Sequence, residues 1–291
     1  MLAEFLQFLF SGVTIGATYA LVGLGFAIIY NASHVINFAQ GEFVMISGMS
    51  TVSLLAVGMP LPVALLLAVG ITVVVGVALE KFAVEPARNA SVVTLIIITI
   101  GASIFLRGAA EVIWGRDFHS VPAFSGSEPI IIGGAALLPQ SLWVIGATVV
   151  VIIALRWFFG RTRTGKAMLA TSYNPLVARL MGINTRFILS LSFGLAAMLG
   201  ALAGILIAPI SLTYPSVGVM LGLKGFCAAI LGGLGNPMGA ILGGLIVGVS
   251  EAMTAGYISS AYKDAVAFVI ILVVLVMIPN GLFGVKGTER V

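Results

Sequence analysis

Long apolar runs without charged residues alternate along this chain with short segments that hold most of its charges. A run of about 20 apolar residues is long enough to cross a bilayer as a helix. The run at 43–79 is too long for one span, and Pro60 and Pro62 divide it because proline interrupts a helix. The pattern predicts nine crossings, or eight if one short segment re-enters. The expected spans are 5–32, 43–79 divided at 58–62, 90–106, 141–159, 187–208, 219–234, 237–257 and 264–284.

The composition also indicates a membrane protein. Hydrophobic residues make up 60% of the 291 residues, and the 14 basic and 10 acidic residues together make up 8%. A soluble domain carries about 25% charged residues. These proportions exclude an ordinary soluble enzyme and a nucleic-acid-binding protein. We expect an all-α, polytopic transmembrane bundle with interrupted helices, formed as a single domain by residues 1–291.

The segment 156–186 fixes the expected orientation, because it carries six of the 14 basic residues and no acidic residue. Short loops rich in Lys and Arg stay on the cytoplasmic side of a membrane. The loop at 160–186 is therefore expected inside the cell. By alternation, the loop at 80–89 also lies inside, the loop at 114–140 lies outside, and Lys286 and Arg290 lie inside.

A short helix is predicted within this basic loop. Asn174 is suited to cap the helix, Pro175 to occupy its first position, and Gly182 to end it. A helix of about seven residues is not stable alone, so its apolar side must pack against something. Either the helix folds back on its own bundle, or it enters a groove on a partner protein. The apolar side consists of Leu176, Val177, Leu180 and Met181.

Five ionisable residues lie within or near the expected spans, where such groups are candidates for function. Glu42 lines a pathway, caps the helix break beside it, or extends to the inner face of the membrane. Lys224 is expected to extend its stem toward the outer face. Arg107 and Glu111 are four residues apart and are expected to pair on one helix face. Glu251 has no obvious partner in the sequence.

Catalysis by this chain finds no support in the sequence. The residues at 160–167 match the spacing of a phosphate-binding loop, but Ala167 replaces the Ser or Thr that would hold magnesium. His34 and His119 lie far apart, and no cluster of metal ligands is apparent. We expect a protein that is not an enzyme and binds no cofactor or metal itself.

Glycine spacing and a weak internal repeat point to close helix packing and to a transport pathway. Pairs four residues apart, such as Gly12 with Gly16 and Gly244 with Gly248, allow helix backbones to approach closely. Residues 23–27 resemble 222–228, and each is followed by a helix break, at 37–42 and at 232–239. Paired interrupted segments of this kind often mark a transport pathway.

Several stretches resemble the permeases of branched-chain amino-acid ABC transporters. They are 35–43, 165–168, 174–175, 178–183, 224–226 and 231–240. The resemblance implies a multi-pass protein of the bacterial inner membrane, surrounded by lipid. It implies a related or identical second permease subunit, two ATPase subunits that bind ATP and magnesium, and a periplasmic binding protein. Leucine, isoleucine and valine are the implied substrates.

The resemblance also assigns expected roles to residues. The residues expected to couple to the ATPase are Asn174, Pro175, Leu176, Ala178, Arg179, Met181 and Gly182. The residues expected near the translocation pathway are Asn37, Gln40, Gly41, Glu42, Asn236, Pro237 and Gly239.

One alternative is a stand-alone secondary transporter or channel in which Glu42 or Glu251 couples to an ion. That protein would transport its solute without ATP.

Overall fold

The structure, a computed structural model, describes residues 2–284, so Lys286 and Arg290 lie outside the described residues. The described chain is mostly helical, as expected for an all-α bundle. Its α-helices are α1 (Leu2–Ser33), α2 (Gln40–Ala56), α3 (Leu61–Leu79), α4 (Val92–Trp114), α5 (Pro139–Arg161), α6 (Arg163–Tyr173), α7 (Pro175–Leu180), α8 (Thr185–Ile207), α9 (Val217–Gly232), α10 (Pro237–Tyr257) and α11 (Lys263–Met277).

Each predicted apolar run forms a helix, but the helices differ in length. Within residues 2–284, seven helical segments are long and apolar enough to cross a membrane. They are α1, α4, α5, α8, α10, α3 with the turn that continues it (Leu61–Val84), and α11 with the 3-10 turn that precedes it (Ser260–Met277). By contrast, α2 has 17 residues and α9 has 16. A 16-residue helix spans about 24 Å, which is less than the thickness of a typical hydrocarbon core. The described bundle therefore contains seven helical segments long enough to cross a membrane, together with the shorter apolar helices α2 and α9.

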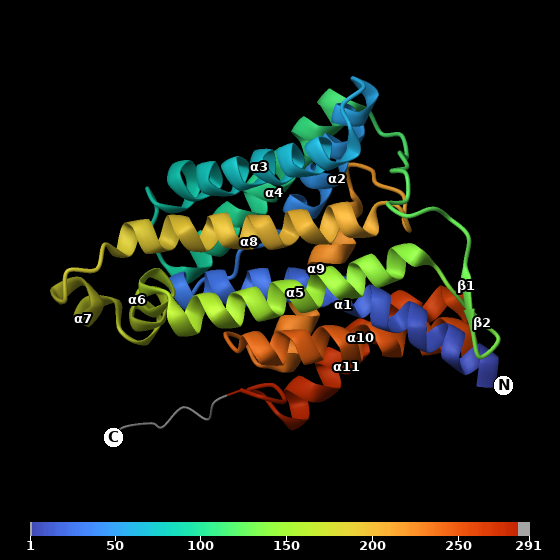
Figure 1. Cartoon of the computed structure of the whole chain (residues 1–291). Helices are drawn as coiled ribbons and strands as arrows, with labels where there is room; N and C mark the ends of the chain where they lie inside the picture. The colour runs from blue at the N-terminus through green and yellow to red at the C-terminus, as the bar shows by residue number, and fades with distance from the viewer. Residues whose placement is uncertain (1, 285–291) are drawn as a thin grey trace.

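Helix α1 lies at the centre of the bundle, and α5, α8, α9 and α10 pack around it (Figure 1). Its contact with α10 is antiparallel and depends on glycine. A Cβ atom added to Gly248 would lie 2.3 Å from the Cα atom of Gly16, and one added to Gly12 would lie 3.1 Å from the Gly248 carbonyl oxygen. The predicted role of spaced glycines in packing helices of one chain is confirmed here.

The two ends of the bundle differ. In Figure 1, α6 and α7 lie at one end, and the N-terminus lies at the other beside the hairpin of β1 (Ile130–Ile132) and β2 (Ala135–Leu137). The Ala136 amide of this hairpin donates to Gln7 Oε1 of α1 at 2.6 Å. We call the end with α6 and α7 the inner end, because it carries the basic segment. The sequence had predicted a polar loop at 114–140 and no strands.

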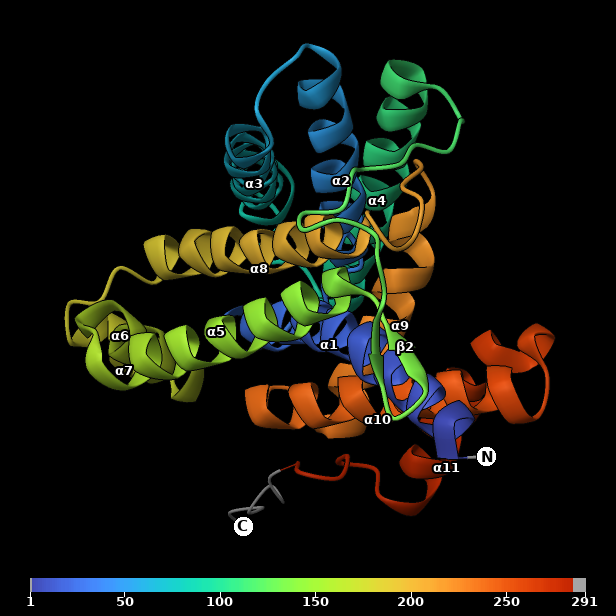
Figure 2. The ribbon, with the colours of Figure 1, turned by 45° about the vertical axis from the view of Figure 1, so that its right-hand side comes forward.

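Helices α2 and α4 lie side by side and cross the set formed by α1, α5, α8 and α10 (Figure 2). The sequence predicted a loop at 80–89. The first half of that prediction is wrong, because a π-helical turn, Glu80–Val84, continues α3. This turn buries Glu80, whose Oε2 accepts a hydrogen bond from Ser190 Oγ of α8 at 2.5 Å.

The two similar segments found in the sequence meet in the core. The rings of Phe26 and Phe226 contact each other with their centroids 5.5 Å apart. A Cβ atom on Gly23 would lie 3.1 Å from the Gly225 carbonyl oxygen. Glycine and phenylalanine residues of the two segments therefore contribute to the contact between α1 and α9.

Candidate functional site

The short helix predicted in the basic loop is present as α7. Asn174 Oδ1 accepts hydrogen bonds from the backbone amides of Leu176 at 3.0 Å and Val177 at 3.1 Å. Pro175 is the first residue of the helix, and Gly182 beyond its end has φ +84°. The cap, the first position and the terminating glycine are each confirmed.

The apolar side of α7 is not covered by the described chain. Leu176, Leu180 and Met181 are 69%, 79% and 78% exposed, whereas Ala178 is buried. Arg179 Nη2 lies 3.4 Å from Thr185 Oγ1 at the start of α8. Helix α7 is thus attached to its own bundle through Ala178, while its larger apolar side chains face outward. This arrangement favours a partner over a helix that folds back.

The first helix break lies deep in the bundle. Asn37, Gln40 and Glu42 are each at most 1% exposed. Gln40 Nε2 donates to the Ala196 carbonyl of α8 at 2.9 Å, and Asn37 Oδ1 accepts from the Ala39 amide at 3.1 Å. Gly41 permits contact with α9, since a Cβ atom there would lie 2.1 Å from the carbonyl oxygen of Gly218.

Three polar atoms at this break have no hydrogen-bond partner in the described structure. They are Asn37 Nδ2, Gln40 Oε1 and Glu42 Oε2, which occur within six residues of one another. Buried polar atoms without a partner are rare and often indicate water or a ligand. The first break therefore has unused hydrogen-bonding capacity inside the bundle.

At the second helix break, by contrast, both polar atoms of the Asn236 side chain have hydrogen-bond partners. Asn236 Oδ1 accepts from the amides of Met238 and Gly239 at 3.1 and 3.2 Å, and its Nδ2 donates to the Phe283 carbonyl at 2.9 Å. Pro237 begins α10, and Gly239 packs directly on the Gly232 backbone. These residues cap and pack α10, so the structure places the two predicted groups of pathway residues in different environments.

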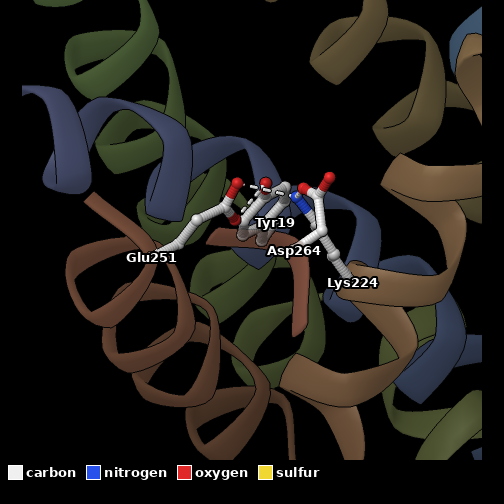
Figure 3. Close-up of polar contacts among 4 residues, drawn as sticks. All are labelled: Tyr19, Lys224, Glu251 and Asp264. Carbon is white, nitrogen blue, oxygen red and sulfur yellow. Dashed lines mark hydrogen bonds and ion pairs between the residues drawn. The ribbon is translucent and has the colours of Figure 1, made fainter. Parts of the chain in front are cut away.

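A buried charged cluster joins four helices and was not predicted (Figure 3). Lys224 Nζ of α9 lies 2.7 Å from Glu251 Oε1 of α10 and 2.6 Å from Asp264 Oδ1 of α11. Tyr19 of α1 donates to Glu251 Oε2 at 2.7 Å, and Lys224 Nζ lies 5.6 Å from the centre of its ring. The single ammonium group is thus held between two carboxylates and an aromatic face.

This cluster corrects two expectations. Lys224 does not extend to the outer face. Its ammonium group pairs with Glu251 and Asp264 instead, and its side chain is only 6% exposed. Glu251 does have partners, and they come from other helices. The acidic residue in the first turn of α11, Asp264, was a weak signal for this contact.

Two further expectations for ionisable residues are wrong in part. Glu111 pairs with Arg116 at 2.9 Å, because the chain turns at the end of α4 and returns Arg116 toward it. Arg107 is therefore not the partner that helical spacing predicted. Glu42 does not extend to a membrane face; it stays buried, and its Oε1 accepts from Ser103 Oγ of α4 at 2.8 Å.

A cavity of about 870 Å³ opens near the inner end between α1, α5, α6 and α10, and we call it the inner cavity. Its lining is mainly apolar and includes Ile28, Ile152 and Phe159. Its polar side chains are those of Asn31, Arg156, Ser172, Tyr173 and Asn236. Of the predicted pathway residues, Asn236 and Pro237 line this cavity, and those of the first break do not.

These features define a multi-pass α-helical membrane protein with an uncovered helix at its inner end and polar groups at a buried break. Comparison with known families then specifies the class. The chain belongs to the family described as the permease component of the branched-chain amino acid transport system, whose model matches residues 8–275. The resemblance drawn from the sequence motifs is confirmed.

Individual relatives of the chain are permeases of the same kind. The chain is 34% identical to the high-affinity branched-chain amino acid transport system permease protein LivH of Salmonella typhimurium, over 99% of this chain and 98% of that protein. It is 33% identical to the corresponding protein BraD of Pseudomonas aeruginosa, with the same coverage. These relatives support a permease component and not an ion-coupled transporter.

A solved structure shares the fold. It is PsaBC from Streptococcus pneumoniae in complex with Fab, with a TM-score of 0.52 and 14% identity. The match covers 94% of this chain and 95% of that chain.

Proposed function

We propose that this chain is the membrane-spanning subunit of an ATP-driven importer that carries branched-chain amino acids across the bacterial inner membrane. Its partners are a second permease subunit, related or identical, and a periplasmic binding protein that delivers leucine, isoleucine or valine. Two ATPase subunits at the inner end bind ATP and magnesium. The names of the relatives support this substrate class.

The observation that carries the proposal is the uncovered apolar side of α7. An amphipathic helix that presents apolar residues commonly docks in a hydrophobic groove of a partner. Leu176 and Met181 enter the groove of an ATPase subunit, beside Arg179. Asn174, Pro175 and Gly182 give α7 its ends, and Ala178 joins it to the bundle, so movement of the ATPase is transmitted to the spans as a rigid-body shift.

The translocation pathway passes close to the first helix break. Asn37, Gln40 and Glu42 supply the unused polar atoms there, and Gly41 keeps α2 close to α9. Irregular backbone at membrane depth is tolerated where protein buries it or water reaches it. At the second break, Asn236, Pro237 and Gly239 fix the start of α10 beside that route.

We expect the double change Leu176→Ser with Met181→Ser to weaken association with the ATPase subunits by about tenfold or more, because each apolar side chain contributes on the order of 1.5 kcal/mol when buried. Both residues are exposed, so the fold is retained. The measurement is copurification of the ATPase subunits, together with ATP-driven leucine uptake in vesicles.

The matched control is Ile131→Ser, which removes an exposed apolar side chain on β1 at the opposite end. This variant should keep its ATPase subunits. Normal association and full uptake in the double variant would discard the docking role of α7.

A further inference from the structure

The inner cavity has a composition that does not match the amino-acid substrate. Among the described residues that line it, Arg156 is the one charged side chain, and no Asp or Glu is present. A zwitterionic amino acid entering the cavity would find Arg156 for its carboxylate but no acidic side chain to pair with its ammonium group. The neutral polar side chains of the lining are Asn31, Ser172, Tyr173 and Asn236. The amide of Asn236 is already occupied by the cap of α10 and by Phe283, and Asn31 Nδ2 and Ser172 Oγ donate to backbone carbonyls of the chain. The lining instead suits an anion that carries a long apolar part.

The position of Arg156 matches the depth of a lipid headgroup. It lies five residues before Arg161, the last residue of α5, which is about 8 Å along the helix. An arginine stem can extend over that distance to bring its guanidinium to the interface. The neighbouring Trp157 is 63% exposed, and tryptophan is enriched at this level of a membrane.

The surrounding charge is complementary to an anionic headgroup. Arg161, Arg163 and Lys166 follow Arg156 closely, and the whole segment 156–186 contains no acidic residue. Basic pockets between membrane helices on the cytoplasmic side bind anionic phospholipid headgroups. The volume of about 870 Å³ lies within the range of known ligand sites. Apolar side chains from α1, α5 and α10, such as Ile28, form the rest of the lining.

We propose that the inner cavity binds one anionic phospholipid of the inner leaflet. The phosphate pairs with the Arg156 guanidinium, for which a planar, bidentate donor is well suited. One acyl chain lies along Ile28 and Ile152, between α1 and α5. The lipid thereby fills the space between α5 and α10 at the inner end. This site is independent of the docking role proposed for α7.

The test uses the full-length chain, purified with its copurifying subunits in a mild detergent from membranes that contain phosphatidylglycerol and phosphatidylethanolamine. Retained lipid is counted by native mass spectrometry. We expect the unmodified protein to retain one phosphatidylglycerol in preference to phosphatidylethanolamine. Arg156→Gln should lower this retention about tenfold through loss of a charge-assisted contact. Ile152→Trp, which fills the cavity without changing charge, should lower it as well.

Arg161→Gln is the matched control, because it removes the same charge from the same helix but does not line the cavity. It should retain the lipid, and equal unfolding temperatures will show that the variants are folded. Equal loss in both arginine variants would overturn the proposal in favour of general surface attraction. Absence of lipid from the unmodified complex, or its displacement by saturating leucine, would overturn it in favour of a partner subunit or the substrate.

Discussion

Replacement of Lys224 by methionine is expected to destabilise the protein severely. The substitution removes the ammonium group that pairs with Glu251 and Asp264, while the Glu251 side chain stays only 6% exposed. Breaking a buried ion pair from one side costs about 3–5 kcal/mol, since a charge is left without a partner. Asp264 contributes less, because its side chain is 45% exposed and water can solvate it. The measurement is the unfolding temperature in detergent, with an expected fall on the order of 10 °C.

Compensating substitutions separate the charge effect from loss of packing. Glu251→Gln and Asp264→Asn, added to Lys224→Met, should restore most of the stability, because no uncompensated charge remains. The amide that replaces Glu251 can still accept the hydrogen bond from Tyr19. Lys81→Met, an exposed lysine on the π-helical turn, should leave the unfolding temperature nearly unchanged. If Lys224→Met alone is as stable as the parent, the cluster does not hold α11 on the bundle.

Gly239→Ala is expected to have the second large effect. A Cβ atom at this position would lie 2.1 Å from the Gly232 carbonyl oxygen, so the backbones of α9 and α10 must separate. Overpacking of this kind costs about 1–3 kcal/mol, or more where backbone has to move. The measurement is the yield of folded protein in membranes together with its unfolding temperature.

Gly146→Ala on α5 provides the matched comparison. A Cβ atom there has nothing within 4 Å, and alanine is favoured over glycine in a helix by about 1 kcal/mol. This variant should be as stable as the parent or more stable. Equal behaviour of the two alanine variants would show that α9 and α10 do not pack as closely as described.

The positions of the helices could be predicted because they follow from local signals. Charge-free runs locate the spans, and Pro60 marks the turn between α2 and α3. Likewise, Asn174 and Gly182 set the ends of α7 by contacts within a few residues. Helix caps and apolar runs depend on residues that are close together in the sequence, so a single sequence is enough to predict them.

The buried contacts could not be predicted, because they join residues that are far apart in the sequence. Lys224 is separated by 27 residues from Glu251 and by 40 from Asp264, and hydropathy does not reveal which helix faces meet. The same holds for Glu42, whose bond to Ser103 crosses 61 residues. Strands of three residues, such as β1, are too short for an alternating pattern to be distinguished.

Uptake of leucine into sealed vesicles tests the central claim most directly. The chain should be reconstituted alone and with its permease, ATPase and binding-protein partners, and supplied either with ATP or with a proton or sodium gradient. We predict uptake only in the complete assembly and only with ATP. Uptake by the chain alone, driven by an ion gradient without nucleotide, would contradict the assignment of this protein to an ATP-driven importer.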